Sequence, residues 1–164
     1  MEETFAAVWL SRAAVAVMVV YISSAVRIWR LSPQVLANRI AAALCIDLAL
    51  WALQAAVSYA ADDPLVTVNL SKALSWTWPF FPAFGLHLAI EVSSANHRLQ
   101  GKWRTAAVAA IYAGAAFFYF LLAGPLLRGA VRRAGYWSVD LVPSIGYSAF
   151  SIFYLGVNLV GIGF

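Results

Sequence analysis

The chain has 164 residues, of which 63% are hydrophobic and only 11% charged, and its mean hydropathy is +0.81. Soluble domains carry about 25% charged residues, so this composition excludes an ordinary water-soluble domain and indicates a polytopic membrane protein. The net charge of +4 comes without a basic run or stripe, which argues against a nucleic-acid partner and favours arginines that face lipid headgroups.

Apolar segments of membrane-spanning length occupy nearly the whole sequence. A helix needs roughly 20 apolar residues to cross the hydrocarbon core of a bilayer. We therefore predict an all-α bundle of five transmembrane helices in one domain covering residues 1–164. The predicted spans are Phe5–Trp29, Arg39–Ala61, Lys72–Ser94, Thr105–Leu127 and Ser144–Phe164. They leave no room for a soluble catalytic domain, and we expect no enzymatic activity.

Helix-breaking residues separate the predicted spans. Pro33 interrupts the first connection, and Asp62-Asp63-Pro64 is a turn and helix stop. Gly124-Pro125 is predicted to kink or end the fourth span. The longest connection, Arg128–Pro143, contains aromatic residues that suit a membrane interface.

The distribution of basic residues predicts the orientation of the chain. Cytoplasmic loops of membrane proteins carry an excess of Lys and Arg. The first and third connections hold or adjoin Arg27, Arg30, Arg39, Arg98, Lys102 and Arg104. The opposite side holds Lys72, Arg128, Arg132 and Arg133, with Asp62 and Asp63 beside them. We therefore expect an external N-terminus.

Four ionisable residues are candidates for a polar cluster inside the bundle. At about 1.5 Å per residue, Asp47 lies roughly 12 Å and His87 roughly 10 Å from the inner ends of their spans. This matched depth predicts a hydrogen bond between them. Glu91 lies one helical turn below His87, near the level of Arg39. The four residues would then line one polar track between the second and third spans.

Two interpretations of this cluster stay open. A histidine near a carboxylate titrates in the physiological range, which favours a proton- or ligand-responsive switch. Buried polar contacts also fix the packing of membrane helices without any further function. We expect no metal or other cofactor, because Cys45 is alone and a haem held by two histidines lacks its second intramembrane ligand. Ligation of a pigment by His87 alone remains the weaker alternative.

A dense aromatic stretch in the third span predicts a ligand pocket. Phe80, Phe81 and Phe84 surround Pro82, and prolines free backbone carbonyls and loosen a helix. Together with Trp51, and with Tyr59 nearby, they are predicted to wall a pocket for a small apolar or amphipathic ligand. The alternative is an interfacial aromatic belt with ordinary packing, which is favoured for Trp76 and Trp78.

The fourth span carries small residues at helical spacing. Ala106, Ala110 and Gly114 recur every four residues, a pattern that allows two membrane helices to approach closely. The contact is expected either within the bundle or between two copies of the chain.

Several of these segments together resemble a known family. They are Asn38–Ile40, Leu50–Leu53, Ala61–Asp63, Trp78–Glu91, Trp103–Tyr112 and Gly135-Tyr136. Their order and spacing are similar to the seven-helix N-terminal sensor region of bacterial histidine kinases, and related regions also precede diguanylate cyclases. The run P-x-F-x-L-H-L-A-I-E at Pro82–Glu91, followed by a short basic loop, looks like the third-helix signature of that family.

The resemblance implies a non-catalytic sensory or ligand-binding input module that transmits a signal by helix repacking, located in the bacterial cytoplasmic (inner) membrane. A kinase or cyclase would then lie further along the chain, and the sequence is expected to be the front part of a longer protein. The departure from the family is that five spans are predicted instead of seven. The alternative is a small integral subunit or transport component of a larger membrane complex. Expected partners are the lipid bilayer, a small ligand, and a second copy or a larger complex.

Overall fold

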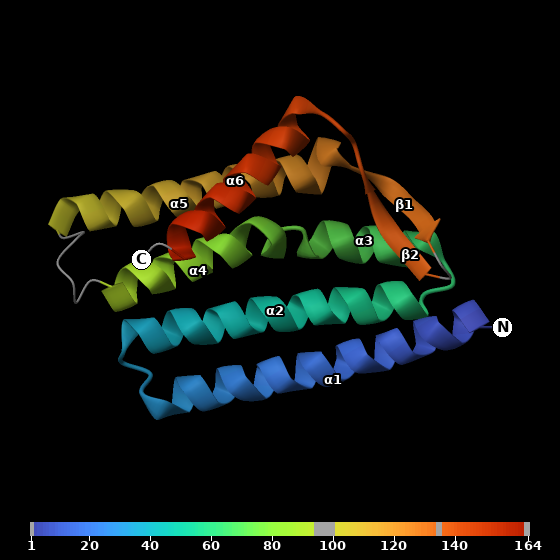
Figure 1. Cartoon of the computed structure of the whole chain (residues 1–164), viewed down its shortest axis with the longest axis horizontal. Coiled ribbons are helices and arrows are strands. Elements are labelled where there is room, and N and C mark those ends of the chain that lie inside the picture. The colour runs from blue at the N-terminus through green and yellow to red at the C-terminus, as the bar shows by residue number, and fades with distance from the viewer. Residues whose placement is uncertain (1, 94–100, 134–135, 163–164) are drawn as a thin grey trace.

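Long helices laid side by side dominate the computed structural model, which describes residues 2–93, 101–133 and 136–162 (Figure 1). In chain order the elements are α1 (Glu2–Leu31), α2 (Leu36–Ala60), α3 (Pro64–Leu74), α4 (Thr77–Ser93), α5 (Gly101–Leu121), a π-helical turn η2 (Leu122–Leu126), β1 (Leu127–Arg133), β2 (Tyr136–Leu141) and α6 (Ile145–Ile162). Helices α1, α2 and α5, and the successive pair α3 and α4, lie along the long axis, whereas α6 crosses them obliquely.

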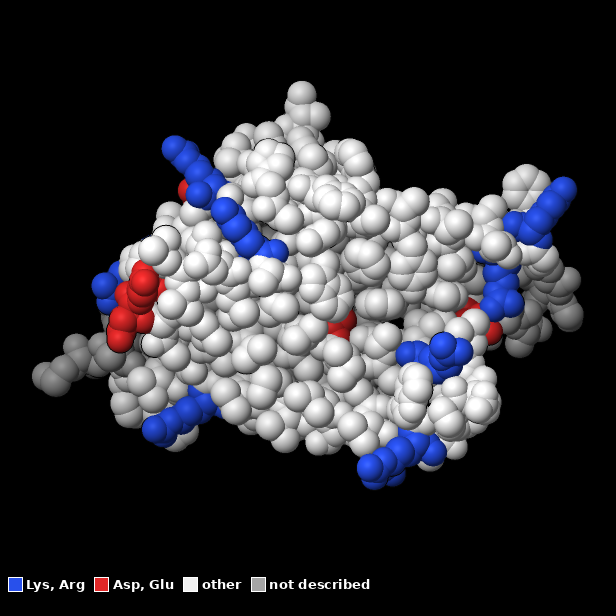
Figure 2. Space-filling model, turned by 180° about the vertical axis from the view of Figure 1, so that it is seen from behind, with Lys and Arg blue, Asp and Glu red and all other residues white. Residues whose placement is uncertain are grey.

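Three helical stretches within the described residues are long and apolar enough to cross a membrane. They are Phe5–Leu31, Leu36–Ala60 and Gly101–Leu126, and the apolar helix Ile145–Gly161 is shorter. Figure 2 shows that Lys and Arg lie mostly toward the two ends of the molecule, and that the middle of this face is almost free of charge. This distribution is compatible with a membrane protein.

The third predicted span is two helices rather than one. The sequence predicted a helix from Lys72, but α3 already begins at Pro64, where Asp63 caps it by accepting a hydrogen bond from the Leu65 N–H at 2.8 Å. Helix α3 ends at Leu74, and α4 begins at Thr77, so the helix is interrupted at Ser75 and Trp76. The predicted turn and helix stop at Asp62-Asp63-Pro64 is present, since α2 ends at Ala60. The sequence prediction missed that the next helix starts at Pro64, because proline fits the first turn of a helix.

Pro79 explains why the helix is broken at Ser75. A proline lacks the N–H that would bond to the carbonyl four residues back, and its ring clashes with that carbonyl, which here belongs to Ser75. Hydroxyl groups bond to carbonyls at the end of α3 instead: Ser75 Oγ donates to the Lys72 carbonyl and Thr77 Oγ1 to the Leu74 carbonyl, each at 2.8 Å. Both hydroxyl residues are fully buried.

The cap on α3 gives a first testable prediction. Replacing Asp63 by alanine should lower the free energy of unfolding by about 1 kcal/mol, because the Leu65 N–H loses its acceptor. Asp62→Ala is the matched control, since among the described contacts Asp62 contributes only its backbone carbonyl. Unfolding by denaturing detergent in mixed micelles measures both variants, and equal losses would contradict the assigned cap.

The fourth predicted span ends where Gly124-Pro125 predicted it. The α-helix widens into η2, which contains Pro125, and the chain becomes extended at Leu127. The next segment was predicted as a plain connection, but it forms an antiparallel hairpin in which Leu127 pairs with Leu141 and Arg133 with Tyr136. The register shifts between Leu127 and Gly129. The all-α prediction is thus right for the helices and wrong for this hairpin.

Two different kinds of packing hold the helices together. Helix α1 lies close against α2 through alanines, including the buried Ala25, Ala49 and Ala56. Its Ser11 hydroxyl donates to the Ala56 carbonyl of α2 at 2.9 Å. Around the end of α5, larger apolar side chains form a buried cluster: Phe118, Leu122, Leu126 and Phe150. Aliphatic and aromatic residues on the outer side of α1 stay exposed.

Candidate functional site

The predicted hydrogen bond between Asp47 and His87 is not formed. Asp47 is 1% exposed, and neither of its carboxylate oxygens has a hydrogen-bond partner. His87 instead lies 3.0 Å, through its Nδ1 atom, from the hydroxyl of Tyr112 on α5. Asp47 and His87 therefore do not meet between α2 and α4, since His87 faces α5.

The carboxylate of Glu91 forms an ion pair with Arg104, in the first turn of α5. The predicted pairing of Glu91 with Arg39 does not occur among the ion pairs of the described residues. The sequence prediction started this helix at Thr105 and so left Arg104 in a loop, whereas α5 begins at Gly101. His97 and Arg98, predicted for the same loop, lie outside the described residues, as does Gly135.

The aromatic residues predicted to form one pocket lie on two sides of α4. The ring of Phe81 lies 5.8 Å from that of Trp51 on α2 and 6.3 Å from that of Tyr154 on α6. The rings of Phe80 and Phe84 instead lie 6.0 and 5.9 Å from that of Tyr112 on α5. Pro82 is buried inside the helix. The prediction of a single pocket wall was therefore wrong.

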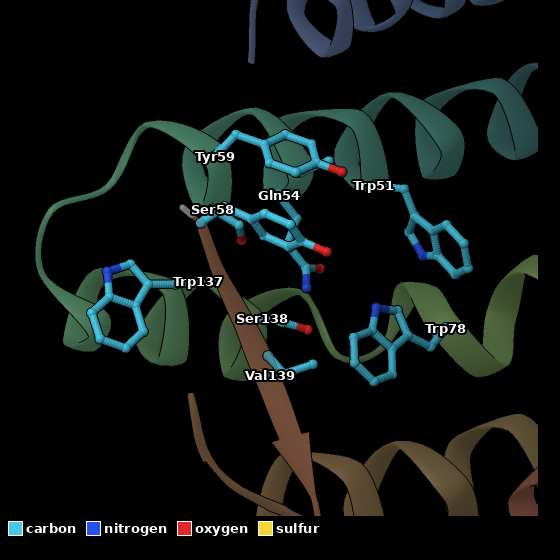
Figure 3. A pocket seen from close by; sticks show the side chains of 10 residues that line it. Trp51, Gln54, Ser58, Tyr59, Trp78, Trp137, Ser138 and Val139 are labelled. Atoms are coloured by element: carbon cyan, nitrogen blue, oxygen red, sulfur yellow. The ribbon is translucent and has the colours of Figure 1, made fainter. Parts of the chain in front are cut away.

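A cavity of about 370 Å³, here called the hairpin cavity, lies between α2, α4 and β2. Its lining includes Trp51, Gln54 and Tyr59 of α2, Trp78 of α4, and residues 136–139 of β2. Figure 3 shows the side chains of Trp51, Gln54 and Trp78 in the space between the two helices. Trp51 and Tyr59 were candidates from the sequence, and both line this cavity.

A second cavity of about 440 Å³, the α6 cavity, shares Trp51 and Trp78 with the first. Its other wall comes from the end of the hairpin and from α6, including Tyr147, Phe150 and Tyr154. The two tryptophans are thus common walls of two neighbouring spaces, both lined mainly by aromatic and aliphatic groups.

Polar atoms without partners mark the α2 side of these cavities. The indole Nε1 of Trp51 and the side-chain Oε1 of Gln54 are buried and make no hydrogen bond. Gln54 Nε2 donates to Ser71 Oγ at 3.0 Å, which fixes the amide on α3. Residues 47, 51 and 54 follow helical spacing and share one face of α2. A buried polar group without a partner costs free energy, and a bound ligand is one way to satisfy it.

Several residues of the hairpin cavity were missed from the sequence. Trp78 was assigned to an interfacial belt, and Trp137 to a connection. Trp137 Nε1 instead donates to the backbone carbonyl of Asp62 at 3.2 Å, and the ring of Tyr136 lies 4.8 Å from that of Tyr59. The spacing of Asp47, Trp51 and Gln54 on α2 was the available signal, because it places three polar groups on one helix face.

Comparison of the chain with protein-family models, with curated protein sequences and with solved structures found no match. The resemblance to histidine kinase sensor regions therefore stays a prediction, and the geometry of the cavities carries the functional argument.

Proposed function

We propose that the chain is a non-catalytic sensory input module in a membrane, which binds a small apolar or amphipathic ligand in the hairpin cavity. The observation that carries the proposal is that two residues lining this aromatic cavity, Trp51 and Gln54, each have a buried polar atom without a hydrogen-bond partner, Nε1 and Oε1 respectively. Ligand sites commonly combine an apolar lining with a few polar groups that orient the ligand. A ligand with an apolar body and one hydroxyl or amide group matches this lining.

The proposed placement is that of a five-span protein of the bacterial cytoplasmic membrane. In it, α3 and α4 together make the third crossing and α6 the fifth. The N-terminus and the hairpin lie at the same end of the molecule (Figure 1), which we assign to the external side. The basic residues Arg27, Arg30 and Arg39 near the connection between α1 and α2 support a cytoplasmic position for the opposite end.

The proposed transmission is a change in helix packing. Trp78 lies in the first turn of α4, directly after the break at Ser75 and Trp76, and the hairpin forms the facing wall. A ligand between them touches the start of α4 and the hairpin. It shifts the equilibrium between two packings only if it binds one of them more tightly. A downstream kinase or cyclase, as the family resemblance implies, would respond to α4 and the helices after it.

The exposed side of α1 favours a second candidate, a subunit of a larger membrane complex. Trp9, Val20 and Trp29 are 55%, 62% and 49% exposed, so α1 offers an apolar surface to lipid or to another protein. A protein that co-purifies in constant ratio with the chain, and is lost when Val20 is replaced by tryptophan, would support this function over the sensor.

Filling the hairpin cavity tests the proposed function. Ala55 lines the cavity, and Ala55→Trp should raise the dissociation constant of 4-tert-butylphenol at least about tenfold, equivalent to about 1.4 kcal/mol. The phenol supplies an apolar body and a hydroxyl group for Gln54. Isothermal titration calorimetry in a non-ionic detergent measures the constant.

Ala110→Trp on α5 is the matched control, because Ala110 is exposed and lines none of the cavities described here. Its dissociation constant should stay within about twofold of the unsubstituted chain, less than about 0.5 kcal/mol. Equal binding by both variants and the unsubstituted chain would place the phenol elsewhere and overturn the proposal.

A further inference from the structure

The buried carboxyl group of Asp47 is the feature that the proposed function leaves unexplained. Asp47 lies near the middle of α2, is 1% exposed, and has two carboxylate oxygens without hydrogen-bond partners. An acidic residue in a membrane interior is costly unless it is paired, and it generally marks a functional site. Packing alone does not account for it, because a structural clamp would hold at least one of these oxygens in a hydrogen bond.

Asp47 lies beside the wall of the α6 cavity. Trp51, one helical turn further along the same face of α2, lines that cavity. On the facing helix, Tyr154 also lines it, and the ring of Tyr154 lies 6.3 Å from that of Phe81, which packs on Trp51 at 5.8 Å. The carboxyl group therefore lies one helical turn from Trp51, a side chain that a molecule in the α6 cavity would touch.

No protein cation serves this carboxyl group in the part of the chain that the structure describes. Neither cavity has a lysine or arginine in its lining. Arg104 is paired with Glu91, and His87 lies on the α5 side of α4 with Tyr112. A positive charge for Asp47 would have to come from a bound molecule.

The walls of the α6 cavity also suit a positive charge. The faces of aromatic rings carry negative partial charge and attract ammonium groups, most strongly when water is excluded. Trp51, Trp78, Tyr147, Phe150 and Tyr154 supply such rings. An unpaired carboxylate beside aromatic walls combines the two features that recognise an organic cation.

We propose that the α6 cavity binds an organic cation, an ammonium group with an apolar body, whose positive charge is directed at the carboxylate of Asp47. This second site goes beyond the proposed function, which rests on the hairpin cavity. The shared walls Trp51 and Trp78 would couple occupancy of the two sites.

A pair of ligands of equal shape and different charge tests the proposal. Phenyltrimethylammonium carries a positive charge, and tert-butylbenzene is its neutral isostere. The unsubstituted chain in a non-ionic detergent should bind the cation at least about tenfold more tightly than the hydrocarbon. Asp47→Asn, which keeps the size of the side chain, should remove this preference and leave binding of tert-butylbenzene unchanged.

Two further variants make the result specific. Asp47→Glu retains the charge and should keep part of the preference for the cation. Asp140 lies on β2 but lines neither cavity, so Asp140→Asn should keep the whole preference. Equal affinity of the unsubstituted chain for both ligands, or a cation preference that survives Asp47→Asn, would overturn the inference. The dissociation constant of 4-tert-butylphenol for the Asp47→Asn variant tests the hairpin cavity separately. Unchanged phenol binding would show that a failure concerns only the cation site.

Discussion

Replacing Phe118 by alanine is expected to lower the free energy of unfolding by about 3–5 kcal/mol. Phe118 is 8% exposed and belongs to the buried cluster at the end of α5. Its ring lies 4.9 Å from that of Phe153 and 5.7 Å from that of Phe150, so it holds α6 against α5. In a membrane the loss is one of packing contacts, because lipid is as apolar as the core.

Phe120→Ala is the control for this substitution. Phe120 lies on the same helix and is 70% exposed, so its removal leaves no cavity and should cost less than about 1 kcal/mol. Titration with denaturing detergent in mixed micelles compares the two variants. A Phe118 variant as stable as the Phe120 variant would mean that α6 does not pack on α5 as described.

Replacing Gly114 by leucine is expected to destabilise the protein by about 1–3 kcal/mol. A Cβ atom at Gly114 would lie 2.9 Å from Cε2 of Phe153, closer than two carbon atoms approach without a clash. The Phe153 ring also packs on Phe118, and moving it disturbs the same cluster. The small-residue pattern of this helix therefore serves a contact inside the bundle at Gly114.

Gly156→Leu is the matched control, since a Cβ atom there meets nothing within 4 Å. Both substitutions replace a helical glycine and gain about 1 kcal/mol of helix propensity, which cancels in the comparison. Gly114→Leu should cost less free energy of unfolding when Phe153 has already been replaced by alanine than it does in the unsubstituted chain. An additive effect of the two changes would contradict the contact.

Helices were predictable from the sequence wherever one local signal decided them. Apolar length gave α1 and α2 to within a few residues, and Gly124-Pro125 gave the end of the fourth helix. The break at Ser75 depends on a clash with Pro79, four residues later. The continuous apolar and aromatic sequence around it predicted one unbroken span instead. The hairpin was missed because Arg128–Arg133 lacks the alternation of apolar and polar residues that predicts a strand.

The candidate site was predictable only in part. The sequence gives the depth of a residue along its helix, but it does not tell which neighbouring helix the side chain faces. Counting placed Asp47 and His87 at one level. Which of α2, α5 and α6 each side chain would face depended on how the helices are arranged around α4. Trp51 was a candidate from the sequence and lines the hairpin cavity, whereas Trp78 required knowledge of the hairpin that covers it.

The hydrogen bond from Trp137 to the backbone carbonyl of Asp62 spans 75 residues of sequence. Since the acceptor is a main-chain atom, any amino acid with a compatible backbone at position 62 still provides it. The donor is a single indole N–H, and phenylalanine at position 137 would abolish the bond while keeping an aromatic ring. Natural substitutions should therefore be tolerated at position 62 and restricted at position 137.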